Sequence, residues 1–239
     1  MNKGFEITKP VENFLTLDYI SLSTDGVNYG EKLHHMGVFN LLLQKRYEGE
    51  IYFKYTFTAN KIPSVCSALI ENMNIKEVKI NGKTLTKHTS YIQKELWEYD
   101  IAKEIKEGVN EIVVLVNWHQ DDIVYYALFD ETATESIKNC LAYNSDAEAM
   151  YLKGDFGVSG DFKPGRASDV LIGENFALVE QKKFVNELIT DGYPFFSGNI
   201  NLKQTVNVSD TNRYLEIPER FHLVDVKVNG VDCGRMMFD

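Results

Sequence analysis

A β-strand pattern occurs twice in this chain, and the second copy ends before the pattern is complete. Each copy has a strand-like segment and then a second one that ends in Asn-Gly, at 49–57 and 78–82 and again at 198–206 and 226–230. The first segments are offset by 149 residues, from Ile51 to Ile200, and the turns by 148, from Asn81 to Asn229. The first copy continues into an apolar run at 112–116 that has no counterpart in the second. This repeat predicts two β-sandwiches in tandem, the second one incomplete, within a longer protein.

Hydrophobic periodicity predicts a chain built mainly of strands. Apolar and polar residues alternate through 51–57, the period-2 pattern of a strand with one buried face. The run 112–116 is continuous and rich in β-branched residues, which favours a strand buried on both faces. Each Asn-Gly pair is a strong turn signal, because both residue types tolerate positive φ. Helical patterns are limited to 36–47 and 131–141, so the sequence predicts an all-β sandwich fold.

The best candidate for a domain boundary is the glycine-rich stretch 153–165. Its glycines and Pro164 favour turns, and it lies between the two copies of the repeat. A chain of 239 residues is long enough for one large domain or two small ones. We therefore expect one β-sandwich over residues 1–160 and a second, partial β-sandwich over residues 161–239.

Charge and cysteine usage exclude several classes of partner. The net charge of −10 opposes binding to nucleic acid or to an anionic membrane. No apolar run approaches the roughly 20 residues that span a bilayer, and the first residues lack the apolar stretch of a secretory signal. The cysteines, Cys66, Cys140 and Cys233, are widely spaced and odd in number, which favours reduced thiols. The lack of a signal peptide and of paired cysteines favours a cytoplasmic location.

Several motifs resemble those of one known family. The segments 69–72, 78–83 and 106–112 include the Asn-Gly turn and a Gly-Val-Asn-Glu strand start. They resemble the sugar-binding β-sandwich of family 2 glycoside hydrolases. The segments 151–158 and 192–198, the latter reading Gly-Tyr-Pro-Phe-Phe-Ser-Gly, resemble linking segments of α-L-rhamnosidase-like hydrolases. The resemblance covers most of the chain and implies a galactose-binding-like jelly roll, here in two tandem copies of which the second is truncated.

The resemblance also implies a role without catalysis in this chain. In these hydrolases the catalytic acid and nucleophile lie in a (β/α)8 barrel, and nothing in this sequence matches a barrel. We therefore expect a non-catalytic accessory, carbohydrate-binding region of a large glycoside hydrolase, with a carbohydrate and the missing catalytic barrel of the same polypeptide as partners. A purely structural or protein-interaction module without sugar binding is the alternative. Asn110-Glu111 superficially resembles the pair before a family 2 acid/base, but here it opens a sandwich strand.

The residues best suited to contact a sugar follow the run 112–116. Aromatic faces lie against the C–H groups of sugars, and planar polar side chains bond their hydroxyls. The candidates are Trp118, His119, Gln120, Asp122, Tyr125 and Tyr126. A sugar site predicts that Trp118, His119 and Tyr125 converge on an exposed concave surface. The alternative is that Trp118 and Tyr126 cover the open end of the core, and a purely structural role predicts buried side chains.

Two other aromatic segments are expected to pack against protein. Trp97, between Leu96 and Tyr99, suits a core position or an inter-domain contact. The segment 193–196, Tyr-Pro-Phe-Phe, is rigid and apolar. It is expected to pack against the first sandwich or the missing barrel.

No motif predicts a cofactor or a resident metal. His34 and His35 are adjacent, and adjacent side chains point in different directions on a helix or a strand, so they make a poor metal pair. Asp121 or Asp122 with loop carbonyls would suit a structural calcium ion, although no Asp-x-Asp-x-Asp-Gly loop is present. The sequence also lacks a Gly-x-Ser-x-Gly elbow and a glycine-rich phosphate loop.

Overall fold

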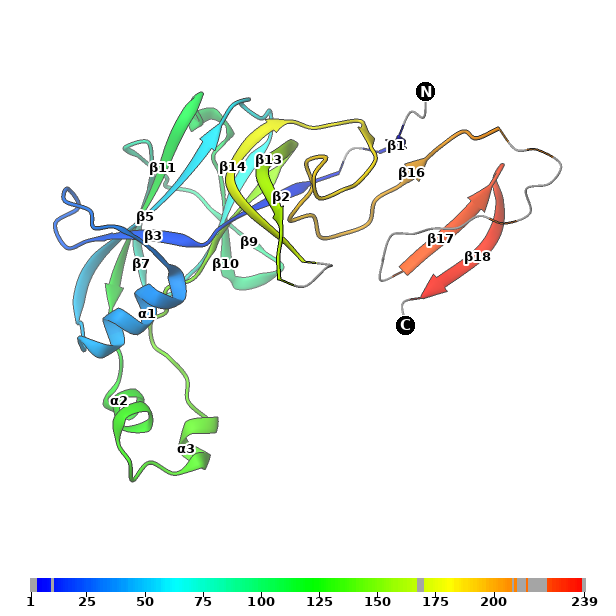
Figure 1. The fold of residues 1–239 in the computed structure, drawn as a ribbon. Helices are drawn as coiled ribbons and strands as arrows, with labels where there is room; N and C mark the ends of the chain where they lie inside the picture. The colour runs from blue at the N-terminus through cyan, green and yellow to red at the C-terminus, as the bar shows by residue number, and fades with distance from the viewer. Residues whose placement is uncertain are drawn as a thin grey trace. The chain divides into compact units, whose positions relative to one another are not determined.

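The computed structural model describes residues 4–9, 11–166, 170–207, 209, 214 and 223–237. Figure 1 shows a chain of many strands with few helices, and the all-β prediction is confirmed. The chain divides into two compact units, Met1–Gln204 and Thr205–Asp239. This division lies between 204 and 205, whereas the sequence placed the boundary between 160 and 161.

The first unit is a sandwich of two mainly antiparallel sheets. One sheet has five strands in the order β2 (Asn13–Leu17), β12 (Met150–Gly154), β6 (Cys66–Glu71), β10 (Gln93–Asp100) and β9 (Thr89–Tyr91). The other has the order β13 (Phe156–Pro164), β14 (Leu171–Glu180), β5 (Gly49–Ala59), β11 (Gly108–Trp118), β7 (Ile75–Ile80) and β8 (Lys83–Thr84). Two strands lie off this path, β3 (Tyr19–Ser23), which pairs with β5, and β4 (Lys32–His34), which pairs with β3.

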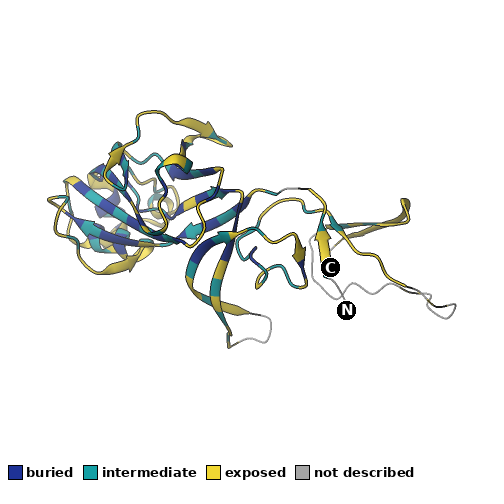
Figure 2. Ribbon diagram, turned by 90° about the horizontal axis from the view of Figure 1, so that it is seen from above, coloured by how far each residue is buried: buried dark blue, intermediate teal, exposed yellow. Residues whose placement is uncertain are grey.

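The core lies between these sheets because their strands alternate in burial. In β5 every second residue from Ile51 to Ala59 is buried, and Figure 2 shows the same alternation along neighbouring strands. In β11 the buried residues also alternate, so Val113 and Leu115 are only half-buried. The strand at 112–116 is therefore present, but it is not fully buried on both faces as the sequence predicted. Each fully buried aliphatic side chain contributes about 1.5–3 kcal/mol to stability.

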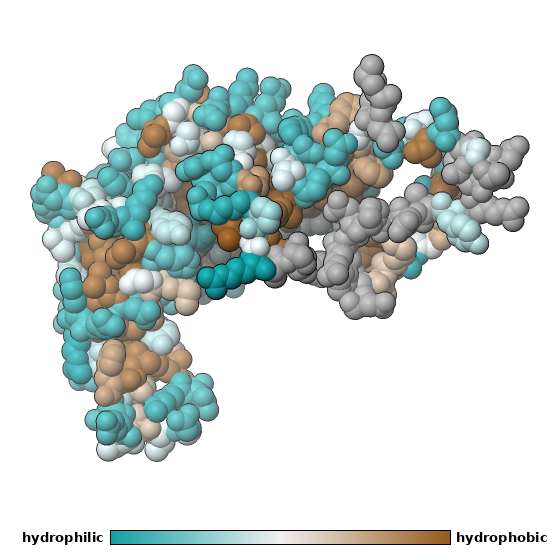
Figure 3. Space-filling model, viewed as in Figure 1, coloured by the Kyte–Doolittle hydropathy of each residue, from teal (hydrophilic) through white to brown (hydrophobic). Residues whose placement is uncertain are grey.

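Helices are confined to short connections in the described part of the chain. They are α1 (His35–Gln44), α2 (Asp122–Phe129), α3 (Glu135–Asn139) and the 3-10 turn η1 (Ala102–Glu104). The sequence predicted α1 and placed α3 within 131–141, but it treated the residues of α2 as a loop. α2 leaves Ile123, Leu128 and Phe129 exposed, and Figure 3 shows apolar surface in the region of the helices. None of the described helices is long and apolar enough to cross a membrane.

The glycine-rich stretch 153–165 forms strands, so the expectation of turns there is wrong. Gly154 ends β12, and a Cβ at this position would collide with the carbonyl oxygen of Val65. At Gly160 in β13, a Cβ would lie 2.7 Å from the ring of Phe176. These glycines therefore allow close approach between neighbouring segments of the sandwich.

The segment 193–196 belongs to the first unit and packs against its sandwich. The Tyr193 side chain is buried, and its hydroxyl donates to the carbonyl oxygen of Lys182 at 2.7 Å. Phe195 packs edge-to-face on Phe176 with ring centroids 4.9 Å apart. A three-stranded sheet of β15 (Phe184–Val185), β1 (Phe5–Ile7) and β16 (Leu202–Lys203) follows in the same unit.

The second unit contains a hairpin of β17 (Leu223–Val228) and β18 (Val231–Met237). Asn229 and Gly230 connect the two strands with φ values of 50° and 83°, and Asn81 and Gly82 connect β7 to β8 with 49° and 85°. Both copies of the repeat therefore use the same Asn-Gly turn, as predicted. The segment 210–222 lies almost entirely outside the described residues, and a second sandwich stays a prediction.

Candidate functional site

Trp118, the first predicted sugar contact, is a core residue. It ends β11, and its side chain is completely buried. Its ring packs against Phe53 of β5 and Phe39 of α1, with centroid distances of 6.2 and 6.0 Å. The indole therefore closes the end of the sandwich and presents no ring face to a ligand.

The next two predicted residues are held by the segment that precedes β12. Gln120 is buried, its Oε1 accepts from the backbone N–H of Asn144 at 2.9 Å, and its Nε2 donates to the carbonyl oxygen of Ser145. His119 is half-buried, and its backbone N–H donates to Ser145 Oγ at 3.2 Å. These bonds join the two ends of the helical insertion that contains α2 and α3.

The remaining predicted residues lie on α2 and point in different directions. Tyr125 is buried beneath the guanidinium of Arg46, which lies 4.8 Å from the ring centroid, and burial raises the pKa of this tyrosine. Tyr126 is half-buried and its hydroxyl donates to the carbonyl oxygen of Thr132 at 3.3 Å. Asp122 is exposed in the first turn of the helix. Trp118, His119 and Tyr125 therefore do not form an exposed concave surface in this structure.

Asn110, which resembles part of a catalytic motif, has a structural role. Its side chain is fully buried. Its Nδ2 donates to the carbonyl oxygens of Lys106 and Gly108 at 2.7 and 3.0 Å, and its Oδ1 accepts from the N–H of Lys106 at 2.9 Å and from Asn81 Nδ2 at 2.8 Å. The neighbouring Glu111 is exposed and pairs with Lys54 at 3.3 Å. The pair therefore fixes the start of β11.

An aromatic surface that sequence reasoning did not identify lies on the five-stranded sheet. The rings of His88 and Trp97 stack with centroids 4.0 Å apart and planes inclined by 19°, and Tyr99 lies 5.4 Å from His88. His88 is exposed and Trp97 is half-buried. Open cavities of about 480 and 450 Å³ border His88. Polar residues along the larger cavity include Ser64, Ser67, Lys87, Glu98 and Asp100.

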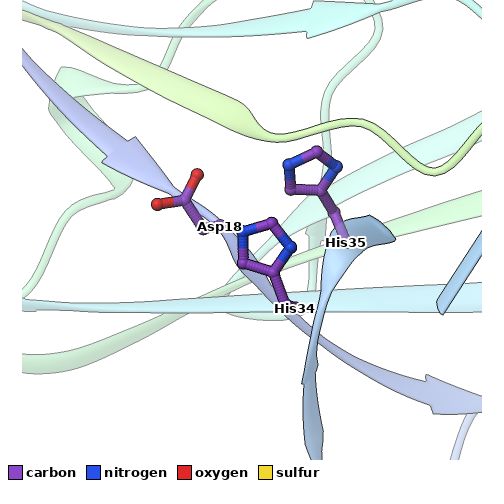
Figure 4. A group of neighbouring side chains, drawn as sticks. All are labelled: Asp18, His34 and His35. Carbon is purple, nitrogen blue, oxygen red and sulfur yellow. The ribbon is translucent and has the colours of Figure 1, made fainter. Parts of the chain in front are cut away.

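The structure also brings together Asp18, His34 and His35, as Figure 4 shows. Asp18 lies between β2 and β3, His34 ends β4, and His35 begins α1. One potential ligand atom from each side chain lies within 4.8 Å of those of the other two. The two imidazole rings have centroids 4.4 Å apart and planes inclined by 32°. The argument that adjacent histidines point apart is therefore wrong here, because the chain changes from strand to helix between them.

Two acidic side chains, Asp146 and Glu148, interact with His35 of this cluster. Burial raises the pKa of Asp146 and of Glu148, and the nearby His35 opposes the shift in both cases. Each of the two is half-buried. By contrast, Asp121, one of the two residues considered for calcium, is exposed, and its carboxylate accepts from Asn144 Nδ2 at 3.0 Å.

Sequence reasoning missed both of these groupings for the same reason. His88 and Trp97 come from a connection and a strand, and Asp18 is 16 residues before His34 in sequence. No spacing rule links such residues, because their proximity depends on which strands pair. To expect Asp18 near His34, one would have needed the register of the β3–β4 hairpin, in which Tyr19 pairs with His34.

No protein-family model matches the sequence, and no curated protein matches it. Solved structures to which the chain is similar include β-glucuronidase from Ruminococcus gnavus. The apo form is 16% identical with a TM-score of 0.41, and the complex with uronic deoxynojirimycin is 15% identical with a TM-score of 0.41. These alignments cover 68% and 75% of this chain but only 33% and 36% of those chains, so the chain spans about a third of the length of the β-glucuronidases.

Proposed function

We propose that this chain is a non-catalytic β-sandwich region of a larger glycoside hydrolase, and that it supports a catalytic domain elsewhere in the polypeptide. The sequence resemblance at 69–83 and 106–112 supports this family. The observation that carries the proposal is that the residues best suited to chemistry or ligand contact are used to hold the fold. Asn110 satisfies buried backbone groups, and Trp118 fills the core.

The position of the Glu111 carboxylate, in the Asn110-Glu111 pair, disfavours a catalytic role for this chain. Glycosidases place two carboxyl groups across a cleft, about 5 to 9.5 Å apart. Glu111 instead lies on an exposed strand position and pairs with Lys54. The 239-residue chain is therefore expected to release no nitrophenol from a panel of nitrophenyl glycosides, and turnover above that of heat-denatured protein would contradict the proposal.

A sugar subsite is the second candidate function, and the stacked rings of His88 and Trp97 favour it. The half-buried indole of Trp97 lines the smaller cavity, and the same cavity is lined by hydroxyl, ammonium and carboxylate groups from Thr84, Lys76 and Glu77. This surface therefore offers both an apolar face and hydrogen-bonding partners. This surface is a better candidate than the residues around Trp118, because it is accessible.

Tryptophan fluorescence tests the sugar subsite directly, since the chain has two tryptophans. In Trp118→Phe, emission comes from Trp97 alone, and titration with monosaccharides is expected to change its intensity saturably. In Trp97→Phe, the fluorescence of the buried Trp118 is expected not to change when sugar is added. If Trp118→Phe remains folded by circular dichroism and silent at millimolar sugar, the subsite is rejected while the supporting role stands.

The supporting role is tested by sequencing the gene on both sides of this reading frame. The expected result is a continuous frame that encodes a (β/α)8 barrel. A stop codon directly after Asp239 together with a start at Met1 would contradict the proposal.

A further inference from the structure

The side chains of Asp18, His34 and His35 form a set of metal-ligating groups that the supporting role does not use. We propose that these three residues bind one divalent transition-metal ion, with zinc as the best match to the ligands. The ion would join the β2–β3 junction to the β4–α1 junction. The inference does not depend on the proposed function.

The backbone fixes the three residues close together. The N–H of His35 donates to the carbonyl oxygen of Asp18 at 2.8 Å. His34 pairs with Tyr19, the residue after Asp18, in the β3–β4 ladder, and the Tyr19 ring packs edge-to-face on the His34 ring at 5.7 Å. The site is therefore held by two neighbouring connections, and little chain ordering remains to be done when the ion binds.

Hydrogen bonds at the imidazoles of His34 and His35 define which ring nitrogen of each is available to bind a metal ion. His35 Nδ1 lies 3.0 Å from the carbonyl oxygen of Ala147, so Nδ1 carries the proton and Nε2 keeps its lone pair. Metal-binding histidines commonly make this outer contact, which orients the ring. His34 Nδ1 accepts from the N–H of Met36 at 3.3 Å, and it caps α1. Binding through His34 Nε2 would move its proton to Nδ1 and give up this one long bond.

The ligand set selects the class of metal. Two imidazoles and one carboxylate suit zinc and neighbouring transition metals, whereas calcium and magnesium prefer oxygen ligands. Ligand atoms about 2.1 Å from one zinc ion lie at most about 4.2 Å apart. The observed limit of 4.8 Å therefore requires only small side-chain rotations. Three protein ligands leave a fourth position for water.

The charges around the three residues include one that opposes a cation and three that favour it. The partial positive charge at the N-terminus of α1 opposes a metal ion beside it. The carboxylates of Asp146 and Glu148 interact with His35, and Asp18 supplies a third negative group. The chain as a whole carries a net charge of −10.

Isothermal titration of the untagged full chain with zinc chloride tests the site. The expected result is saturable binding of one ion per chain. His34→Asn is the most informative variant, because asparagine is a favourable N-cap and replaces the imidazole without removing a capping acceptor. Since loss of an outer contact alone weakens metal binding by about 10–100-fold, loss of this ligand is expected to weaken it by at least about 100-fold.

His35→Gln and Asp18→Asn are expected to weaken binding to a similar extent, and His88→Asn, which alters an exposed histidine outside the site, is expected to leave it unchanged. Zinc should also raise the thermal midpoint of the wild type but not that of His34→Asn. Absence of saturable binding at millimolar zinc would overturn the proposal. Unchanged affinity in His34→Asn, or equal loss in His88→Asn, would do the same, because binding would then lie elsewhere.

Discussion

At the scale of single residues, the buried amide of Asn110 is a position where substitution is expected to reduce stability. It satisfies both backbone polar groups of Lys106 and also bonds Asn81. Asn110→Ala is expected to lower the free energy of unfolding by about 2–3 kcal/mol, because buried donors and acceptors lose their partners. Urea unfolding measures the change. Asn40→Ala, on the exposed face of α1, serves as the control and should change stability by less than about 0.5 kcal/mol.

Ionisation of the buried Tyr193 is expected to lower the stability of the folded protein at alkaline pH. Burial raises its pKa from 10.0 to about 12. Because the unfolded chain ionises this phenol at lower pH than the folded one, its contribution is complete below pH 10 and is lost as pH rises toward 12. Urea midpoints across this range should fall less steeply in Tyr193→Phe than in the wild type. The exposed Tyr214 provides the comparison, and an equal effect from Tyr214→Phe would contradict the assignment.

At the scale of elements, alanine substitutions of two glycines compare the effect of close packing on stability with the effect of backbone preference. A Cβ at Gly154 in β12 would collide with the carbonyl oxygen of Val65, whereas one at Gly37 in α1 meets nothing within 4 Å. Gly154→Ala is expected to cost about 1–3 kcal/mol through overpacking. Gly37→Ala is expected to stabilise the protein by about 0.5–1 kcal/mol. The thermal unfolding midpoints of both variants test this prediction. Similar midpoints for the two variants would contradict it, because they would show that the collision at Gly154 is relieved.

At the scale of the whole molecule, the second unit is expected to promote association. Within its described residues, β17 and β18 form a two-stranded hairpin, which is marginally stable alone and whose edges pair with no other described strand. The full chain should therefore elute from size exclusion at a volume that depends on concentration. A chain ending at Gln204 should elute as a monomer and keep the fluorescence transition of the first unit, which contains both tryptophans. A clean monomer for the full chain at all concentrations would refute this prediction.

Local features of the fold were predictable from the sequence. The alternation in 51–57, the helix near 36–47 and the two Asn-Gly turns depend on residues adjacent or nearly adjacent along the chain, and the structure contains all of them. The candidate sugar contacts were chosen by residue type alone. Residue type does not define burial, so the sequence left open whether Trp118 contacts a sugar or covers the open end of the core. The structure has Trp118 and Tyr125 in the interior.

The sequence by itself determined that this chain forms paired strands with tight turns, because side-chain periodicity and positive φ are local properties. Only the tertiary structure decided that Gly154 serves close packing, since the carbonyl oxygen that it approaches belongs to Val65, far away in the sequence. It likewise decided that Asp18 meets His34 and His35, because that meeting depends on the register of β3 on β4 and on the change from strand to helix between two adjacent residues.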